Sequence, residues 1–292
     1  MRILVMGGDG MLGHQLLESL QKNHDVRITV RQGAKAYQEY DLFNHESSYF
    51  NVDVRQDENI IPVLEHFKPH AVINAVGVIK QRQIGNDAIS NIEINALFPH
   101  RLSHLCETAH ARLIHFSTDC VFSGKKGKYT ENDISDATDF YGKSKFLGEV
   151  AASHCLTLRT SVIGLELARK ASLIEWFLAQ QGIIKGYKKA IYSGLTTMEI
   201  SRLIETILTK HPTLSGIWHV SSQAISKYDL LKILAFKLNR EDIQIVPDEH
   251  FICDRSLLSE AFNRETGYKA PTWKEMLNEL VQQIKRKIAC SA

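Results

Sequence analysis

The sequence lacks the features that mark several classes of protein. It has only 6 prolines in 292 residues, and no stretch rich in serine, glycine or proline that would act as a flexible linker. Lys and Arg total 35 against 33 for Asp and Glu, whereas nucleic-acid-binding proteins usually carry a clear basic excess. The one basic cluster, residues 285–287, falls in a helical pattern and is expected to be a solvated face. No apolar run approaches the roughly 20 residues of a membrane-spanning helix. We therefore expect neither a nucleic-acid partner nor a membrane partner.

Cysteine and histidine are present without the spacing of a disulfide framework or a metal site. The five cysteines contain no CxxC pair; they are Cys106, Cys120, Cys155, Cys253 and Cys290. This favours a reducing compartment. The first apolar segment reaches glycine at position 7, too early for a secretory signal, so a cytoplasmic location is expected. The His66/His70 and His100/His104 pairs lack the glutamate of an HExxH motif, and no metal is predicted.

Short apolar runs alternate with helical patterns through the first half of the chain. The expected strands are residues 2–6, 26–30, 49–54, 71–75, 112–117 and 156–160, and the expected helices are 11–21, 58–67, 90–109 and 141–152. This alternation predicts an α/β fold, a Rossmann-type doubly wound parallel sheet. The later elements, at 217–220, 227–238, 243–246 and 273–287, predict a smaller C-terminal α/β lobe. We expect an NADP-binding domain over 1–160 and a substrate lobe over 161–292, with segments around 190–215 returning to the first domain.

A glycine-rich turn follows the first expected strand and opens the first helix. Gly7, Gly10 and Gly13 have the spacing GxxGxxG. The first glycine permits a tight turn, the second lets backbone approach a pyrophosphate, and the third allows close packing of helix on strand. Backbone N–H groups and the helix dipole at this turn favour phosphate groups. The pattern predicts a dinucleotide site that also includes Asp9, Met11 and Leu12.

The end of the second expected strand indicates which dinucleotide is bound. It carries Arg31 and no nearby acidic residue. An arginine there binds the 2′-phosphate of NADP, whereas an acidic residue would bind the 2′-hydroxyl of the NAD ribose. This favours NADP(H), with NAD(H) and an ordinary surface arginine as the alternatives. Asp53 and Val54 are expected to border the adenine pocket, or to form an ordinary turn.

A candidate proton-transfer pair follows the fifth strand. Tyr141 and Lys145 are four residues apart, so a helix places them on one face. A nearby ammonium lowers the pKa of a phenol, which makes it usable as a general acid or base. Thr118 stands at the carboxyl end of strand 112–117, the edge where open α/β sheets bind ligands. Its hydroxyl is expected to hydrogen-bond a substrate carbonyl, while Asp119 binds substrate, assists the proton relay or caps a turn.

These motifs together resemble the extended short-chain dehydrogenase/reductases, and within them the dTDP-4-dehydrorhamnose reductase family. The segments that carry the resemblance are residues 7–13, 74–77, 117–124, 129–131, 141–149 and 158–161, with weaker similarity at 193–197, 216–221, 266–268 and Trp273. The resemblance implies that Thr118, Tyr141 and Lys145 are the family's catalytic Ser/Thr–Tyr–Lys set. No GxSxG element supports the alternative of a serine hydrolase.

The resemblance also implies further site residues. Those assigned to the cofactor are Ala75, Val76, Gly77, Ser117 and Thr160. Those assigned more weakly to substrate are Asn95, Asp119, Cys120, Val162, Thr196, Thr197 and Arg255. The chain departs from the family pattern at Val162, where many members carry tryptophan, at Cys120, where many carry tyrosine, and at Leu258, where asparagine is expected. These departures bear on the substrate more than on the chemistry.

The expected function is NADPH-dependent reduction of the C4 keto group of a nucleotide-linked 4-keto-6-deoxyhexose, in deoxysugar and cell-surface polysaccharide biosynthesis. The substrate is of the dTDP-4-dehydrorhamnose type or the UDP-acetamido-sugar type, and the sequence does not choose between them. A homodimer is compatible with the fold. One alternative is an epimerase or dehydratase with tightly bound NAD, against which Arg31 argues. The other is a non-catalytic NADP-binding regulatory subunit, because the β subunit of methionine adenosyltransferase resembles the same family.

Overall fold

The computed structural model describes residues 1–79, 87–168 and 170–291. For residues 290 and 291 it describes the backbone only. The chain forms two compact units, each built from several segments. Unit 1 comprises Met1–Thr118, Thr138–Arg159 and Ser201–Trp218, and unit 2 comprises Asp119–Ala137, Thr160–Ile200 and His219–Ala292. The assignment of cofactor binding to residues 1–160 and of substrate binding to 161–292 stays a prediction.

A seven-stranded sheet forms the centre of unit 1, with strand order β11-β6-β5-β4-β1-β2-β3. Its strands are β1 (Arg2–Met6), β2 (Asp25–Thr29), β3 (Ser48–Tyr49), β4 (Ala71–Asn74), β5 (Arg112–Thr118), β6 (Cys155–Thr160) and β11 (Gly216–His219). β1 pairs in parallel with both β2 and β4, so the strand order reverses at β1. Ligands of open α/β sheets bind at such a switch point. The predicted Rossmann-type doubly wound sheet is confirmed.

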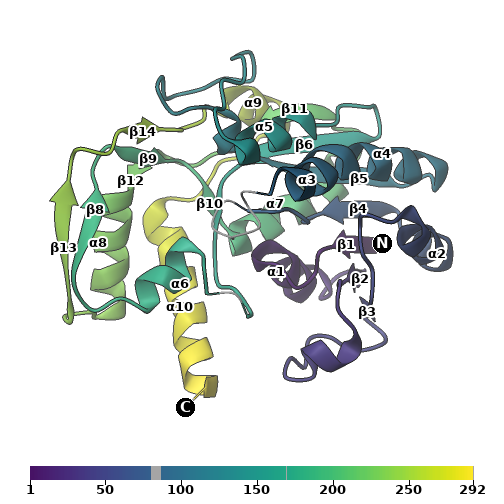
Figure 1. Cartoon of the computed structure of the whole chain (residues 1–292), viewed down its shortest axis with the longest axis horizontal. Coiled ribbons are helices and arrows are strands. Elements are labelled where there is room, and N and C mark those ends of the chain that lie inside the picture. The colour runs from purple at the N-terminus through teal and green to yellow at the C-terminus, as the bar shows by residue number, and fades with distance from the viewer. Residues whose placement is uncertain (80–86, 169, 292) are drawn as a thin grey trace. The chain divides into compact units, whose positions relative to one another are not determined.

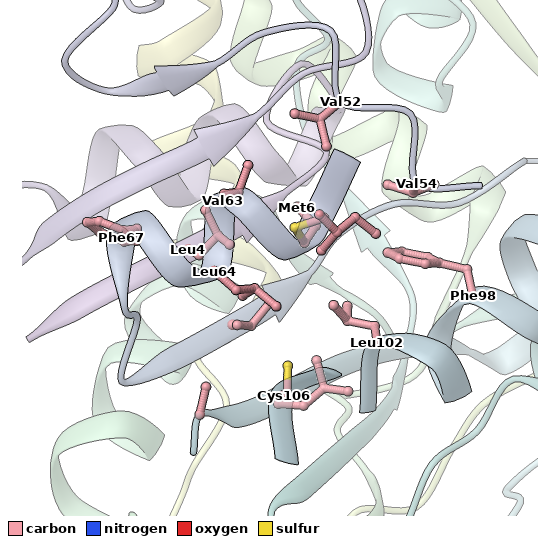
Figure 2. Close-up of a cluster of buried hydrophobic side chains, with 14 of the residues drawn as sticks. Leu4, Met6, Val52, Val54, Val63, Leu64, Phe67, Phe98, Leu102 and Cys106 are labelled. Carbon is pink, nitrogen blue, oxygen red and sulfur yellow. The ribbon is translucent and has the colours of Figure 1, made fainter. Parts of the chain in front are cut away.

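Helices cover both faces of this sheet (Figure 1). They are α1 (Met11–Leu20), α2 (Asp57–Phe67), α3 (Ala88–Ser90), the π-helix η3 (Asn91–Leu97), α4 (Phe98–Thr108), α5 (Phe140–Leu147) and α7 (Thr197–Lys210), with a short 3-10 turn η1 (Ala34–Tyr37). On one face, Leu4 and Met6 of β1 pack with side chains of α2 and α4 (Figure 2). Ile3 and Val5 point to the other face and are also fully buried. Burial on both faces explains why β1 is apolar throughout.

Three expected elements of unit 1 end earlier or differ in type. The strand expected at 49–54 ends at Tyr49, because Asn51 adopts a left-handed conformation with φ 60°. Val52 and Val54 nevertheless lie in the core (Figure 2). The helix expected at 90–109 is interrupted by the π-helical turn, and the helix expected at 141–152 ends at Leu147. Apolar periodicity therefore located these segments correctly without fixing their backbone geometry.

Unit 2 contains three small sheets and a set of helices. The sheets pair β7 (Val162–Ile163) with β10 (Leu195–Thr196), β9 (Ala190–Tyr192) with β12 (Ile225–Ser226) and β14 (Cys253–Asp254), and β8 (Gly182–Tyr187) with β13 (Ile243–Asp248). The helices are η4 (Asp119–Val121), α6 (Leu173–Leu178), α8 (Lys227–Leu238), α9 (Glu260–Thr266) and α10 (Trp273–Ser291). The later segments thus form α/β structure, as expected.

The basic cluster at 285–287 is not wholly a solvated face. Lys287 Nζ donates to the carbonyl oxygen of Glu166 at 2.7 Å and to the carboxylate of Glu175 at 2.8 Å. Glu175 is buried, so Lys287 supplies the charge that compensates a carboxylate inside unit 2. The expectation of a fully solvated cluster was therefore wrong for this lysine.

Among the described residues, no helix combines the length and the apolar character needed to cross a membrane.

Candidate cofactor and proton-transfer site

The glycine turn brings α1 against the end of β1 at very short range. A Cβ added at Gly13 would lie 2.1 Å from the carbonyl oxygen of Gly7, so only glycine fits there. Gly7 itself has φ +82°, a conformation that glycine adopts without strain. Gly10 is the N-cap of α1, so Met11 and Leu12 begin the helix and direct their N–H groups toward the turn. This geometry fits a pyrophosphate, which supports the site predicted from the spacing.

The segment after β4 is packed directly against the glycine turn. A Cβ at Gly7 would meet Val76 Cγ2 at 2.9 Å and Val76 N at 3.2 Å. Asn74 Oδ1 accepts from Val76 N at 3.1 Å, and Asn74 Nδ2 lies 3.1 Å from His115 Nδ1. The segment of Ala75, Val76 and Gly77 thus follows β4 beside the switch point of the sheet, and its contact with the cofactor stays a prediction.

His115 is a buried, neutral anchor of this segment. Burial first, and then the charge of Lys145, lowers the pKa of His115 well below its usual range. Because Asn74 Oδ1 already accepts from Val76, the amide group donates to Nδ1, which leaves the ring proton on Nε2. His115 Nε2 has no hydrogen-bond partner among the described residues.

Asn95 lies inside unit 1, and its side chain joins three elements. Its Oδ1 accepts from Val78 N at 2.9 Å, and its Nδ2 lies 3.0 Å from Val78 O and 3.2 Å from Ser144 Oγ. Asn95 is fully buried. In this geometry Asn95 connects the segment after β4 to α5, and contact with substrate stays a prediction.

The predicted catalytic set comes from β5 and α5. Asp139 caps α5 by accepting from Gly142 N at 2.8 Å, which places Tyr141 in the first turn. Tyr141 is half-buried and Lys145 is buried one turn later. Lys145 Nζ donates to the carbonyl oxygen of Phe116 at 2.6 Å, two residues before Thr118. The structure thus brings α5 and the end of β5 together, as the sequence predicted.

Two opposing effects set the pKa of Lys145. Burial lowers the pKa of Lys145 to about 8, while the nearby carboxylate of Glu149 acts in the opposite direction. At neutral pH the group is therefore a cation, close to the pH at which it loses its proton. Such a cation favours the phenolate form of a neighbouring tyrosine.

A buried ion pair supports the end of β5. Arg159 donates to both carboxylate oxygens of Glu149, with Nε–Oε1 at 2.8 Å and Nη2–Oε2 at 2.7 Å. Ser117 Oγ also donates to Glu149 Oε1, at 2.6 Å. The side chains of Glu149 and Arg159 are only 3% and 6% exposed. Ser117, predicted to contact the cofactor, is thus fixed by this pair.

Arg31 and Asp53 lie in the loops that follow β2 and β3, beyond the strand ends at Thr29 and Tyr49, and Asp53 already has a partner. Arg55 Nε donates to Asp53 Oδ1 and Oδ2 at 3.0 and 3.1 Å. These bonds lower the pKa of Asp53, and the charge of Arg31 adds to that effect. The carboxylate is ionised at neutral pH, and its role toward adenine stays a prediction.

The remaining predicted residues belong to unit 2. Arg255 Nε donates to the carbonyl oxygen of Phe122 at 2.8 Å, and its Nη1 lies 3.5 Å from Cys120 Sγ. Asp119 is buried in η4, directly after Thr118. Thr160, Val162, Thr196 and Thr197 lie at β6, β7, β10 and the start of α7, and the two adjacent threonines are about 1% exposed. Their roles toward cofactor and substrate stay predictions.

The sequence analysis missed the supporting residues Glu149, His115 and Arg55. Glu149 lies within residues 141–149, one of the segments that carry the family resemblance. A single acidic residue among apolar neighbours there indicates a buried ion pair. His115, inside a buried strand, offers a similar signal. Tyr37 was also missed; its hydroxyl donates to Asp9 Oδ2 at 3.2 Å.

The described residues contain no group of three or more His, Cys, Asp or Glu side chains placed to hold a metal ion. Of the two histidine pairs, His100 contacts the carbonyl oxygen of Leu147 at 2.7 Å and His66 contacts Tyr49 Oη at 2.7 Å. Both histidines thus have structural partners.

A Rossmann-type sheet with a glycine turn and a Thr–Tyr–Lys set on β5 and α5 defines an extended short-chain dehydrogenase/reductase. Residues 1–286 match the family described as RmlD substrate binding domain. The chain belongs to this family, which confirms the resemblance seen in the sequence.

The chain is similar to proteins with more than one named function, and to solved structures of the same fold. A dTDP-4-dehydrorhamnose reductase of Aggregatibacter actinomycetemcomitans is 27% identical over 78% of this chain and 76% of that protein. The methionine adenosyltransferase 2 subunit beta of Bos taurus is 26% identical over 51% of this chain and 42% of that protein. The crystal structure of a dTDP-4-dehydrorhamnose reductase from Bacillus anthracis in complex with NADP has a TM-score of 0.77 at 21% identity, covering 97% of this chain and 99% of that one.

Proposed function

We propose that the protein is an NADPH-dependent reductase of the C4 keto group of a nucleotide-linked 4-keto-6-deoxyhexose. As a member of its family with a complete Thr118–Tyr141–Lys145 set, it is an NAD(P)H-dependent oxidoreductase of nucleotide sugars. The observation that carries the proposal is the bond from Lys145 to the carbonyl oxygen of Phe116, which holds the tyrosine-bearing helix at the strand end that presents Thr118.

The residues of unit 1 fit NADP(H). The glycine turn and the first N–H groups of α1 would hold the pyrophosphate, and Arg31 would hold the 2′-phosphate. Ala75, Val76, Gly77 and Ser117 would border the ribose and nicotinamide side. When bound, the cofactor supplies the hydride that reduces the carbonyl carbon.

The chain's own residues manage the charge and the proton. The Thr118 hydroxyl donates a hydrogen bond to the substrate carbonyl oxygen, where negative charge develops. Tyr141 donates its proton to that oxygen, completing the alcohol. The ammonium of Lys145 makes the phenol a stronger acid, and Glu149 helps to keep that ammonium protonated.

The substrate class rests on the relatives and on unit 2. Relatives named dTDP-4-dehydrorhamnose reductase favour a dTDP-linked sugar. Val162, Cys120 and Leu258 differ from the family pattern, which keeps a UDP-linked acetamido sugar as the second form of the substrate. We place the reaction in the cytoplasm, in deoxysugar and cell-surface polysaccharide biosynthesis. A homodimer stays an expectation of the sequence.

The test is NADPH oxidation, followed at 340 nm, with dTDP-linked and UDP-linked 4-keto-6-deoxy sugars. Oxidation that requires one of these sugars, with a C4 alcohol as product, would support the proposal and identify the nucleotide. Absence of turnover with the whole panel by a protein that binds NADPH would contradict it.

A regulatory NADP-binding subunit is the second candidate, because proteins named methionine adenosyltransferase 2 subunit beta match about half of the chain. NADPH binding without turnover of any sugar would favour it. The third reading, an epimerase or dehydratase, predicts that the purified protein retains NAD through gel filtration.

A further inference from the structure

We propose that Arg55 is a specificity-determining residue for NADP(H), acting by pairing the Asp53 carboxylate that would otherwise repel the 2′-phosphate beside Arg31. The inference rests on the proposed cofactor and adds a residue that neither the motifs nor the family resemblance assigns. Arg55 follows Asp53 by two residues in the connection between β3 and α2.

The backbone brings the two loops together. Beyond the ends of β2 and β3, Val52 N still donates to Val30 O at 3.0 Å, and Asn51 N donates to Gln32 O at 3.1 Å. The two acceptors, the carbonyl oxygens of Val30 and Gln32, flank Arg31 in the chain. The loop that carries Asp53 is therefore hydrogen-bonded to the loop that carries Arg31. The 2′-phosphate of NADP is recognised at the end of the second strand, within this pair of loops.

The carboxylate of Asp53 would repel a phosphate at this position unless another residue compensates the charge of that carboxylate. An acidic residue at the end of the second strand favours NAD, whose ribose hydroxyl donates to it. Asp53 follows the third strand, but its loop is hydrogen-bonded to the loop of Arg31, which brings a carboxylate near the same position. A 2′-phosphate carries close to two negative charges at neutral pH and would be repelled by a bare carboxylate.

Arg55 supplies the compensation. Its backbone N–H donates to Asp53 Oδ1 at 3.0 Å, and its guanidinium binds both carboxylate oxygens. Nη2 of Arg55 also donates to Asp53 Oδ2, so four hydrogen bonds hold this geometry in addition to the charge. Both side chains retain solvent contact, Asp53 at 23% and Arg55 at 46%, so the pair is accessible to a bound ligand. With Asp53 paired, Arg31 leaves the site with a net positive charge.

The mechanism predicts a pattern that a direct contact between Arg55 and phosphate would not give. In Arg55→Gln, the unpaired Asp53 should weaken NADPH binding about 5- to 20-fold and change NADH binding less than 2-fold. Adding Asp53→Asn to that variant removes the repelling charge and keeps an acceptor for the adenine amine. The double variant should therefore regain NADPH affinity to within about 3-fold of wild type.

The experiment is a fluorescence titration of the full chain with NADPH and with NADH, for wild type, Arg55→Gln, Asp53→Asn/Arg55→Gln and Lys22→Gln. Lys22 is an exposed lysine of the same unit, so its variant controls for loss of one positive charge. Rescue in the double variant together with an unchanged Lys22→Gln would support the proposal. Equal weakening of NADH and NADPH in Arg55→Gln, an unchanged NADPH affinity, or a double variant as weak as the single one would overturn it.

Because the readout is binding, the result is independent of any sugar substrate. Failure of the proposed reductase activity would appear as missing NADPH oxidation with normal binding ratios. Failure of the inference would appear as an NADPH-to-NADH affinity ratio that Arg55→Gln leaves unchanged, or as a double variant that binds NADPH no better than Arg55→Gln, in a protein that still oxidises NADPH.

Discussion

Lys145 Nζ lies 2.6 Å from the carbonyl oxygen of Phe116, so a buried ammonium joins α5 to the carboxyl end of β5. This bond places the proposed acid, Tyr141, and the proposed carbonyl-binding residue, Thr118, on two elements held by one side chain. The same burial that fixes the geometry also lowers the pKa of Lys145 to about 8. Position and charge of this lysine are therefore coupled, and both are open to measurement.

The pH dependence of turnover should report the charge of Lys145. Below pH 8 the group is an ammonium that strengthens Tyr141 as an acid; as the pH rises through about 8 it becomes neutral, and kcat/KM should fall. The measurement is kcat/KM for the sugar nucleotide between pH 6 and 10. Lys143→Gln, a change at an exposed lysine of the same helix, should leave the profile unaltered. A wild-type profile that is flat up to pH 10 would contradict the assignment.

Gly10 and Gly13 should respond differently to alanine. A Cβ at Gly13 meets the Gly7 carbonyl oxygen at 2.1 Å, so Gly13→Ala should cost about 1–3 kcal/mol of unfolding free energy or more. A Cβ at Gly10 meets that oxygen at 3.3 Å, so Gly10→Ala should change stability by less than about 1 kcal/mol. It should instead weaken NADPH about 10-fold or more, because the methyl group occupies the pyrophosphate approach. Thermal unfolding and NADPH titration separate the two effects, and equal behaviour of the variants would refute the account of the turn.

Arg159→Met should destabilise the protein by about 3–5 kcal/mol, because it leaves the buried Glu149 carboxylate without its cation. Adding Glu149→Met should recover much of that loss. Urea unfolding measures both changes. Lys185→Met is the control: Lys185 is 69% exposed and pairs with Asp248 at the surface, where loss of the pair should cost less than about 1 kcal/mol. An Arg159→Met cost no larger than this control would rule out the buried pair as a support of β5.

His115 should make the protein sensitive to mild acid. Its pKa is lowered well below 6.5 in the folded protein, so the unfolded chain binds a proton that the folded protein does not. Above pH 6.5 this group costs the folded protein no stability. As the pH falls below 6.5, protonation of the unfolded chain lowers the free energy of unfolding by up to about 1.4 kcal/mol per pH unit. Between pH 7 and 5.5, wild type should lose about 1 kcal/mol more unfolding free energy than His115→Gln. Identical losses would show that His115 is not the buried neutral group described.

Much of unit 1 was predictable from the sequence because its signals are local. A buried strand, a glycine turn and an amphipathic helix follow one another within residues 2–20, and each has its own pattern. The i, i+4 spacing likewise places Tyr141 and Lys145 on one helical face. The family resemblance then pointed to the catalytic set that the structure brings to β5 and α5.

The supporting interactions were not predictable, because they join residues far apart in the chain. Nothing near His115 in sequence indicates Asn74 as its partner, and nothing near Asn95 indicates Val78 and Ser144. The π-helical turn at 91–97 has the same apolar periodicity as an ordinary helix. The sequence pattern of residues 49–54 is that of a strand, and it does not indicate that the left-handed conformation of Asn51 ends pairing before residue 54.

The central claim is that Tyr141 is the proton donor of a reductase, and the most direct measurement compares wild type with Tyr141→Phe. The substitution removes the hydroxyl and keeps the ring, so NADPH binding should change less than about 3-fold. Single-turnover NADPH oxidation in the presence of the sugar nucleotide should fall about 100-fold or more, the scale typical of a lost general acid. Undiminished oxidation by Tyr141→Phe would contradict the account.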